Sequence, residues 1–397
     1  MLSTLTERGQ VDNVLIFVSD SHRFDSVPKT VTQHGVTFEG VSASTFTASG
    51  LPSILTGQLP STHKIWHFDD QLERMPPLLK NARNVGFNAE TIWTDLPPRQ
   101  KPPLKIHHVD ERTKLDELDS PFVHIVHDKG GHSPYNEDFE NSQGSEAYFE
   151  NVGSHRSARN DYVDAVESSA DRFADIVAQL EDRSILEETL LIFCSDHGEF
   201  IGEKNLGQIY GHGHPMAPPL VQVPIVFCGA GLKSGVVADE PISTADIAPT
   251  AMRSLGWSPR QDIFGQSIWR KTPSRSQPLL SEVWKKGKHR GRSYNKYAAT
   301  GAWSTGESGV VFHRYSALAR ASYGLATHLY TASHASLTRS HANHVTIKRI
   351  LGSHSPGVVK YGSNLEVSRE SVTNEFEAAD RTQYDIDEEQ LKKLGYQ

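Results

Sequence analysis

The chain of 397 residues has only two cysteines, Cys194 and Cys228, and each lies inside an apolar run. A disulfide framework needs more cysteines than this, so we expect two buried thiols. Basic charge is also scarce, because 40 Lys and Arg stand against 48 Asp and Glu and leave a net charge of -8. Nucleic-acid-binding proteins normally carry a basic excess, so the sequence predicts no nucleic-acid partner.

Long hydrophobic runs are absent as well. The longest, such as VLIFV and PIVF, have the length of a strand, whereas a membrane-spanning helix needs about 20 apolar residues. The N-terminal MLSTLTERGQVDN carries charges where a secretion signal needs an uninterrupted apolar stretch. The sequence therefore predicts no integral membrane segment and a cytoplasmic location.

Short apolar runs alternate with segments of helical period along the first two thirds of the chain. This alternation is typical of strands that are buried on both faces of a mostly parallel sheet. We therefore predict an α/β fold, an α/β/α sandwich with a mostly parallel central sheet. The expected strands cover 14–20, 122–128, 190–196 and 223–229, and the expected helices cover 156–182 and 241–257.

The length favours one large domain and a smaller one, because a single core stops growing near roughly 250–300 residues. We place the large domain at residues 1–270. Residues 271–300 are polar and basic, which predicts a linker or surface crossing, with a phosphate-binding patch as the alternative. Residues 301–397 are expected to form a small α+β subdomain and an acidic tail.

Three of the predicted strands end in aspartate: Asp20, Asp128 and Asp196. In open α/β sheets, functional residues collect beyond the carboxyl ends of the strands, so these three side chains are candidates for one common site. The alternative is that each carboxylate only caps a loop or helix, which is a common role of aspartate at such positions.

Histidines accompany these aspartates at spacings that suit metal binding. His197 follows Asp196 directly, and His132 lies four residues after Asp128 across a two-glycine turn, while GHGHP adds His212 and His214. Mixed aspartate and histidine ligands bind divalent cations. As a group, these residues suffice for two metal centres.

The stretch SASTFTASGLPSILTG (42–57) places hydroxyl side chains immediately before a helix-like segment. A hydroxyl in such a turn lies where the helix N-terminus favours an anion, which is typical of a nucleophile loop. An ordinary Ser or Thr N-cap is the other interpretation.

The motifs VLIFVSD, FTASGLPSILTG, HDKGGHSPY, SDHGEFIGE, GHGHPMAPPLVQVPIVF and STADIAPTAMRSLGW resemble, in this serial order, the sulfatase-like branch of the alkaline phosphatase superfamily. The resemblance covers roughly residues 12–270. It implies an alkaline phosphatase-like catalytic domain and a metal-dependent ester hydrolase.

The resemblance also implies a nucleophile. Counting ten residues back from Gly57 gives Thr47, where a formylglycine-dependent sulfatase needs Cys or Ser. Formylglycine cannot be made from threonine, and a threonine here resembles the nucleotide pyrophosphatase and phosphodiesterase branch instead. A threonine hydroxyl becomes nucleophilic at neutral pH only when a cation or base activates it.

The ligand set follows from the same resemblance, and two divalent ions are expected, Zn or Mn, with Ca as an alternative. His212 aligns with the family position better than His214 does, and Lys129 is either a contact to an ester oxygen or a solvent-facing lysine. The first ion is assigned to Asp20, Thr47, Asp196 and His197, and the second to Asp128, His132 and His212.

The function predicted on this basis is hydrolysis of phosphate mono- or diesters through a covalent phosphothreonine, on a small-molecule, saccharide or lipid ester. Two ions favour phosphate, because a dianionic transition state gains more from a second cation. The alternatives are a sulfuric ester hydrolase without formylglycine, a phospho-head-group transferase, and a non-catalytic, metal-bound sugar- or lipid-binding relative. The sequence leaves the oligomeric state open.

Overall fold

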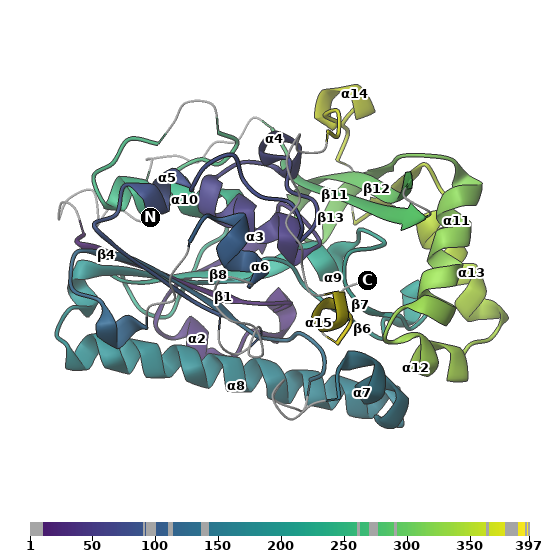
Figure 1. Ribbon diagram of the computed structural model, residues 1–397, viewed down its shortest axis with the longest axis horizontal. Coiled ribbons are helices and arrows are strands. Elements are labelled where there is room, and N and C mark those ends of the chain that lie inside the picture. The colour runs from purple at the N-terminus through teal and green to yellow at the C-terminus, as the bar shows by residue number, and fades with distance from the viewer. Residues whose placement is uncertain are drawn as a thin grey trace.

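The computed structural model describes residues 11–89, 92, 101–109, 114–135, 143–259, 263–269, 277–289, 292–362, 365–377, 388–393 and 395. A central sheet lies between two layers of helices, and a second sheet with its own helices adjoins it (Figure 1). The predicted α/β/α sandwich is confirmed.

The central sheet has the strand order β10-β2-β8-β5-β1-β4-β3, with β9 paired to β2. β1 is parallel to β4 and β5, while β8 runs antiparallel to β5 and β2, so the sheet is mixed but mostly parallel. All four predicted strands are present. The bounds are β1 Asn13–Ser19, β2 Gly35–Val41, β3 Asn84–Asn88, β4 Phe122–Asp128, β5 Thr189–Cys194, β8 Gln222–Gly229, β9 Val236–Val237 and β10 Ile242–Ser243.

Alternating side chains of β1 supply two separate cores. Val14 and Ile16 pack on one face of the sheet, and Leu15 and Phe17 pack on the other, because successive strand residues point to opposite faces. The first face is covered by α3 Thr47–Thr56, α5 Pro77–Lys80, α6 Pro102–Ile106 and α10 Ile247–Ser254, and the second by α2 Lys29–Thr32 and α8 His155–Asp182.

The predicted helix at 156–182 is confirmed as α8, which runs along the bottom of the molecule in Figure 1. The Ser154 side chain caps its first turn by accepting a hydrogen bond from the Ser157 backbone N–H. The helix expected at 241–257 begins later, at Ile247, because residues 242–243 pair with β2 as strand β10. Tertiary pairing thus displaces the start of this helix.

The segment expected to be a linker, 271–300, instead contains most of a hairpin in the second sheet, whose order is β11-β12-β13-β14. The lysines that made the segment resemble a loop sit on paired strands: Lys285 lies opposite Tyr297, and its ammonium lies 3.0 Å from the ring centroid of Phe46. The strands are β11 Leu279–His289, β12 Arg292–Thr305, β13 Ser308–His313 and β14 Val358–Tyr361.

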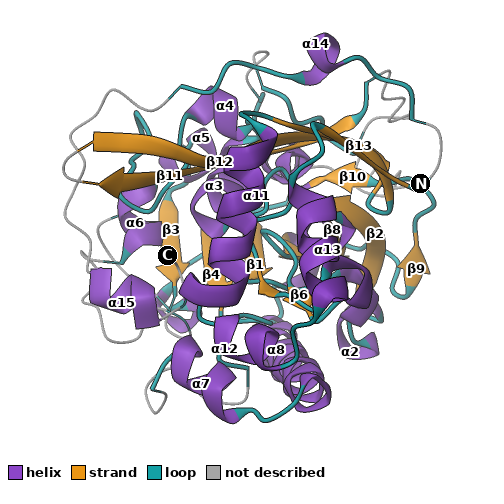
Figure 2. Cartoon of the chain, turned by 90° about the vertical axis from the view of Figure 1, so that its right-hand side faces the viewer, coloured by secondary structure: helices purple, strands orange, loops and turns teal. Residues whose placement is uncertain are grey.

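Between β13 and β14 the chain forms α11 Ala317–Ala326, the π-helix η7 Thr327–Thr331, α12 Ala335–Ser340 and α13 His344–His354, and α11 and α13 face the viewer in Figure 2. After β14 come α14 Arg369–Val372 and α15 Glu388–Lys393. Shorter elements complete the fold: α4 Pro60–His63, α7 Ser145–Asn151, α9 Pro218–Val221, β6 Phe200–Ile201 and β7 Tyr210–Gly211.

Two expectations from composition have clear outcomes. Cys194 and Cys228 are both buried, free thiols, as predicted. Within the described ranges, no helix combines the length and the apolar character that crossing a bilayer requires.

Candidate active site

The carboxylates of Asp20 and Asp196 meet beyond the carboxyl ends of two neighbouring parallel strands. Asp20 directly follows β1, and Asp196 comes two residues after β5. Ligand atoms of Asp20, Asp196 and His197 all lie within 4.8 Å of one another, and all three residues are fully buried. The predicted first ligand group is thus brought together by the edge of the sheet.

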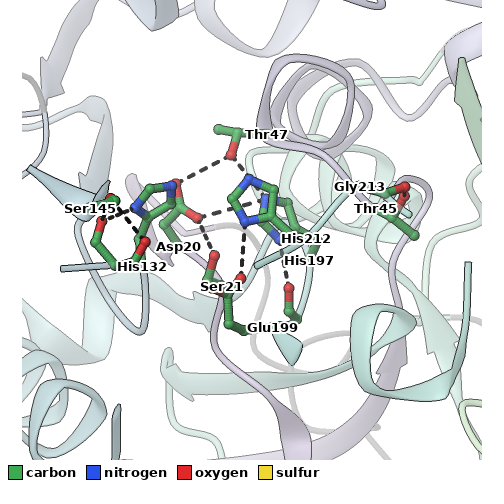
Figure 3. A network of polar contacts seen from close by, with 12 residues as sticks. Asp20, Ser21, Thr45, Thr47, His132, Ser145, His197, Glu199, His212 and Gly213 are labelled. Atoms are coloured by element: carbon green, nitrogen blue, oxygen red, sulfur yellow. Dashed lines mark hydrogen bonds and ion pairs between the residues drawn. The ribbon is translucent and has the colours of Figure 1, made fainter. Parts of the chain in front are cut away.

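Thr47 joins this group as the first residue of α3. Its Oγ1 lies 3.0 Å from Nε2 of His197 and 3.3 Å from Oδ2 of Asp20 (Figure 3). Nδ1 of His197 donates to the Gly198 carbonyl at 2.9 Å, so Nε2 carries the lone pair. Because Thr47 begins α3, its hydroxyl also lies at a helix N-terminus, where a developing negative charge is favoured.

The two buried carboxylates affect one another. Burial raises the pKa of Asp20, but the hydrogen bond with His127 and the charge of that ring act against burial, and the pKa lies well below its usual value. Burial and the charge of Asp20 raise the pKa of Asp196. Two carboxylates this close favour a cation between them.

The donor set fits a divalent metal ion. Oδ2 of Asp196 is buried and has no hydrogen-bond partner among the described residues, and it lies 3.6 Å from Nε2 of His197. The same nitrogen lies 3.7 Å from Oδ1 of Asp20. Oxygen and imidazole ligands around one tetrahedral ion are typically about 3.3 Å apart, so a small contraction brings these atoms to coordination distances.

Two further predicted residues, His132 and His212, border the same site. The ring centroid of His212 lies 4.4 Å from that of His197 and 5.2 Å from that of His132. Nδ1 of His212 contacts Oε2 of Glu199 at 3.0 Å. Burial lowers the pKa of His132 to about 4, and burial together with His197 holds the pKa of His212 well below its usual value. Both rings are therefore neutral at pH 7.

The structure does not place Asp128 in this group as the sequence predicts. Its carboxylate forms a bidentate ion pair with Arg172 at 2.6 and 2.9 Å and also accepts a hydrogen bond from Ser169 at 2.6 Å. Both partners lie on α8. Because neighbouring residues of a strand point to opposite faces, it is His127 that reaches Asp20, at 3.2 Å.

The other residues that the sequence suggested for the site lie in different surroundings. Lys129 is buried rather than solvent-facing. His214 leaves the active-site group and contacts His354 at 3.0 Å. The neighbouring hydroxyls of Thr45, in the loop before α3, and Ser49, in α3, bond backbone carbonyls instead: Thr45 donates to Gly213 and Ser49 to Phe46.

Sequence reasoning missed His127 and Glu199, and also Ser21, whose hydroxyl donates to Asp20 at 2.9 Å. His127 was detectable, because strand alternation allows only one of two neighbouring residues to face the site. Glu199 had the weaker signal of lying two residues after the Asp196-His197 pair.

Comparisons with known proteins agree with this geometry. The sulfatase family pattern matches residues 108–257. The chain is 36% identical over 326 residues to the low-salt glycan biosynthesis sulfotransferase Agl7 of Haloferax volcanii, covering 81% of this chain and 80% of that protein. Human arylsulfatase K is 31% identical over 111 residues, covering 28% of this chain but 18% of its own length.

Solved structures share the fold at low sequence identity. The phosphonate monoester hydrolase of Agrobacterium radiobacter superposes with a TM-score of 0.56 at 15% identity, covering 76% of this chain and 87% of that one. BT4656, solved with its substrate D-glucosamine-2-N,6-O-disulfate, gives a TM-score of 0.54 at 11% identity, covering 77% and 89%.

Substitution of Asp196 and substitution of Asp128 should have opposite effects on metal binding and on stability. Asp196→Asn should lose the bound divalent ion without destabilising the metal-free protein, because it removes one of two like charges. Asp128→Asn should keep the ion but lower the free energy of unfolding by about 1–3 kcal/mol, the cost of a broken buried pair discounted because Arg172 is 37% exposed.

The measurements are metal content after dialysis and denaturant unfolding of the metal-free proteins. Loss of the ion from Asp128→Asn with its retention in Asp196→Asn would contradict the assignment.

Proposed function

Since this chain belongs to the sulfatase family and is an ester hydrolase, we propose that it cleaves a sulfuric ester of a saccharide through a covalent intermediate on Thr47. One observation supports this choice over a phosphate monoester: among the described residues, one carboxylate pair lies beside Thr47, while Asp128 is held by Arg172. One cation suits a monoanionic sulfate ester, whereas a phosphate monoester gains more from two.

Asp20, Asp196 and His197 would hold the divalent ion, and Thr47 adjoins them. When bound, such an ion makes the threonine hydroxyl a stronger acid and offsets charge on the reacting oxygens. The three protein ligands leave room for the hydroxyl oxygen. This arrangement supports Zn or Mn, and also Ca, as expected for mixed oxygen and nitrogen ligands.

Thr47 Oγ1 attacks sulfur, and the bond between sulfur and the sugar oxygen breaks. We assign the transfer of the Thr47 proton to the departing sugar oxygen to His212. Its ring centroid lies 4.4 Å from that of His197, the imidazole beside Thr47 Oγ1, and its Nδ1 contacts Glu199. Water then attacks the same sulfur, the bond to Thr47 breaks, the hydroxyl regains a proton, and sulfate departs.

The neighbouring cavity supports an anionic substrate. A cavity of about 280 Å³ is lined by His132, His212, Lys285 and Lys296, among others. Burial and the nearby Lys296 hold the pKa of Lys285 well below its usual value. A bound anion would reverse that shift, so the cavity favours a negatively charged saccharide ester.

A second candidate is transfer of the sulfuryl group to a saccharide hydroxyl. The observation that favours it is that the 36% identical relative of Haloferax volcanii is a glycan biosynthesis sulfotransferase. The chemistry differs only in the final acceptor: a sugar hydroxyl replaces water in the attack on the Thr47-bound sulfur and yields a new sulfuric ester.

Thr47 is tested with p-nitrophenyl sulfate and p-nitrophenyl phosphate. Thr47→Ala should lower kcat on the sulfate by on the order of 10³-fold or more, because the nucleophile is removed. Thr47→Ser should stay within about 10-fold, since the hydroxyl remains and only the methyl group that restricts its rotamer is lost.

Ser49→Ala is the matched control, since Ser49 lies in the same helix and its hydroxyl donates to the Phe46 carbonyl. If Ser49→Ala were inactive while Thr47→Ala remained active, the assignment of Thr47 as the nucleophile would be wrong. Faster turnover of the phosphate than of the sulfate would instead favour the phosphate ester hydrolase.

The final acceptor is identified by product balance. With p-nitrophenyl sulfate and added glucosamine or glucuronic acid, hydrolysis should release nitrophenol and free sulfate in equal amounts. A deficit of sulfate matched by sulfated sugar would identify transfer. Thr47→Ala should abolish both products, because both routes share the same intermediate.

A further inference from the structure

A second histidine cluster lies outside the active site. His214, His328 and His354 offer ring nitrogens that all lie within 4.8 Å of one another. The residues are 4%, 2% and 0% exposed. They come from three separate elements: His214 follows β7, His328 lies in η7, and His354 ends α13.

Hydrogen bonds to the outer nitrogens orient two of these rings. Nδ1 of His354 donates to the Ile350 carbonyl at 2.8 Å, so its Nε2 carries a lone pair. Nδ1 of His328 lies 3.0 Å from Nε2 of a fourth histidine, His334. Metal-bound histidines commonly use the second ring nitrogen for a bond of this kind, which fixes the tautomer.

One nitrogen in the cluster is left without a bond. Among the residues that the structure describes, Nε2 of His328 is buried and has no hydrogen-bond partner. A buried polar atom without a partner is unfavourable, and a metal ion would satisfy this one.

The backbone around the cluster is also specialised. His328 sits in the π-helix η7, and π-turns frequently mark functional sites. Gly324 of α11 lies so close to His354 that an added Cβ would come within 2.6 Å of its ring. The helices therefore pack closely enough to bring the imidazoles together.

We propose that His214, His328 and His354 bind a Zn²⁺ ion, with water from the adjoining cavity as the fourth ligand. All three ligands are imidazoles, which zinc accepts readily, whereas the Asp20 and Asp196 site offers oxygen. His214 and His328 line the cavity of about 280 Å³, so a fourth position is open to solvent or substrate. Burial keeps the pKa values of all three below the usual value, so the rings are neutral.

Zinc at this position would connect the C-terminal helices to the active-site loop. His214 lies two residues after His212, and the Gly213 carbonyl between them accepts a hydrogen bond from Thr45 at 2.7 Å. In the metal-free protein, the contact of His214 Nδ1 with His354 Nε2 is a single hydrogen bond. A zinc ion would replace that hydrogen bond with coordination bonds to histidines from three separate segments of the chain.

The test uses the full chain in an Asp196→Asn background, so that the catalytic ion is absent. The metal-free protein is titrated with Zn²⁺, followed by zinc content, thermal unfolding and the visible spectrum after Co²⁺ substitution. We expect one equivalent of zinc, a raised Tm, and the spectrum of tetrahedral, nitrogen-ligated Co²⁺. His354→Gln should lose all three, and His334→Ala should weaken binding by about 10–100-fold as an outer partner.

His313→Gln is the matched control, because His313 is buried in the same subdomain but bonds the Pro356 carbonyl and is not in the cluster. It should bind zinc as the parent does. If His354→Gln fails to fold, His328→Asn replaces it. Zinc stoichiometry and Tm response unchanged by the cluster substitutions, or no zinc bound by the parent, would overturn the proposal.

Discussion

The burial of two carboxylates side by side is the constraint on which the rest of the site depends. Asp20 and Asp196 are fully buried, and charges removed from water are costly unless they are paired and hydrogen-bonded. Asp20 receives hydrogen bonds from Ser21 and His127, and the Asp196 carboxylate accepts one from the His197 backbone. Hydrogen bonds from the protein thus replace water around most of the carboxylate oxygens, and Oδ2 of Asp196 remains for a cation.

This requirement extends to the backbone around the pair. Gly50, in α3, lies so close that a Cβ there would come within 2.7 Å of the Asp196 carbonyl. Gly130 has a φ of +55°, and a Cβ there would come within 2.3 Å of the Asp20 carbonyl. Glycine is needed at both positions, because the helix carrying Thr47 and the turn after β4 must approach the backbone of the two aspartates closely.

The sequence predicts the strands and α8 well, and it predicts that Asp20 and Asp196 lie together, because buried apolar runs and parallel strand ends are local signals with one geometric outcome. Prediction from the sequence fails where pairing between distant segments determines the structure. The lysine-rich segment after residue 277 becomes strand β11 because β12 pairs with it. Asp128 turns to Arg172 because His127 takes the face toward Asp20. Neither pairing partner is visible from local composition.

The glycine between His212 and His214 explains why these two histidines of the loop after β7 belong to different clusters. His212 and His214 are separated by Gly213, whose φ of +93° only glycine adopts easily. The chain turns there, so His212 joins His197 while His214 joins His354. The family resemblance assigns His212 rather than His214 to one site position. The structure places the two histidines in different clusters, and the backbone at Gly213 joins the cluster beside the C-terminal helices to the group around Thr47.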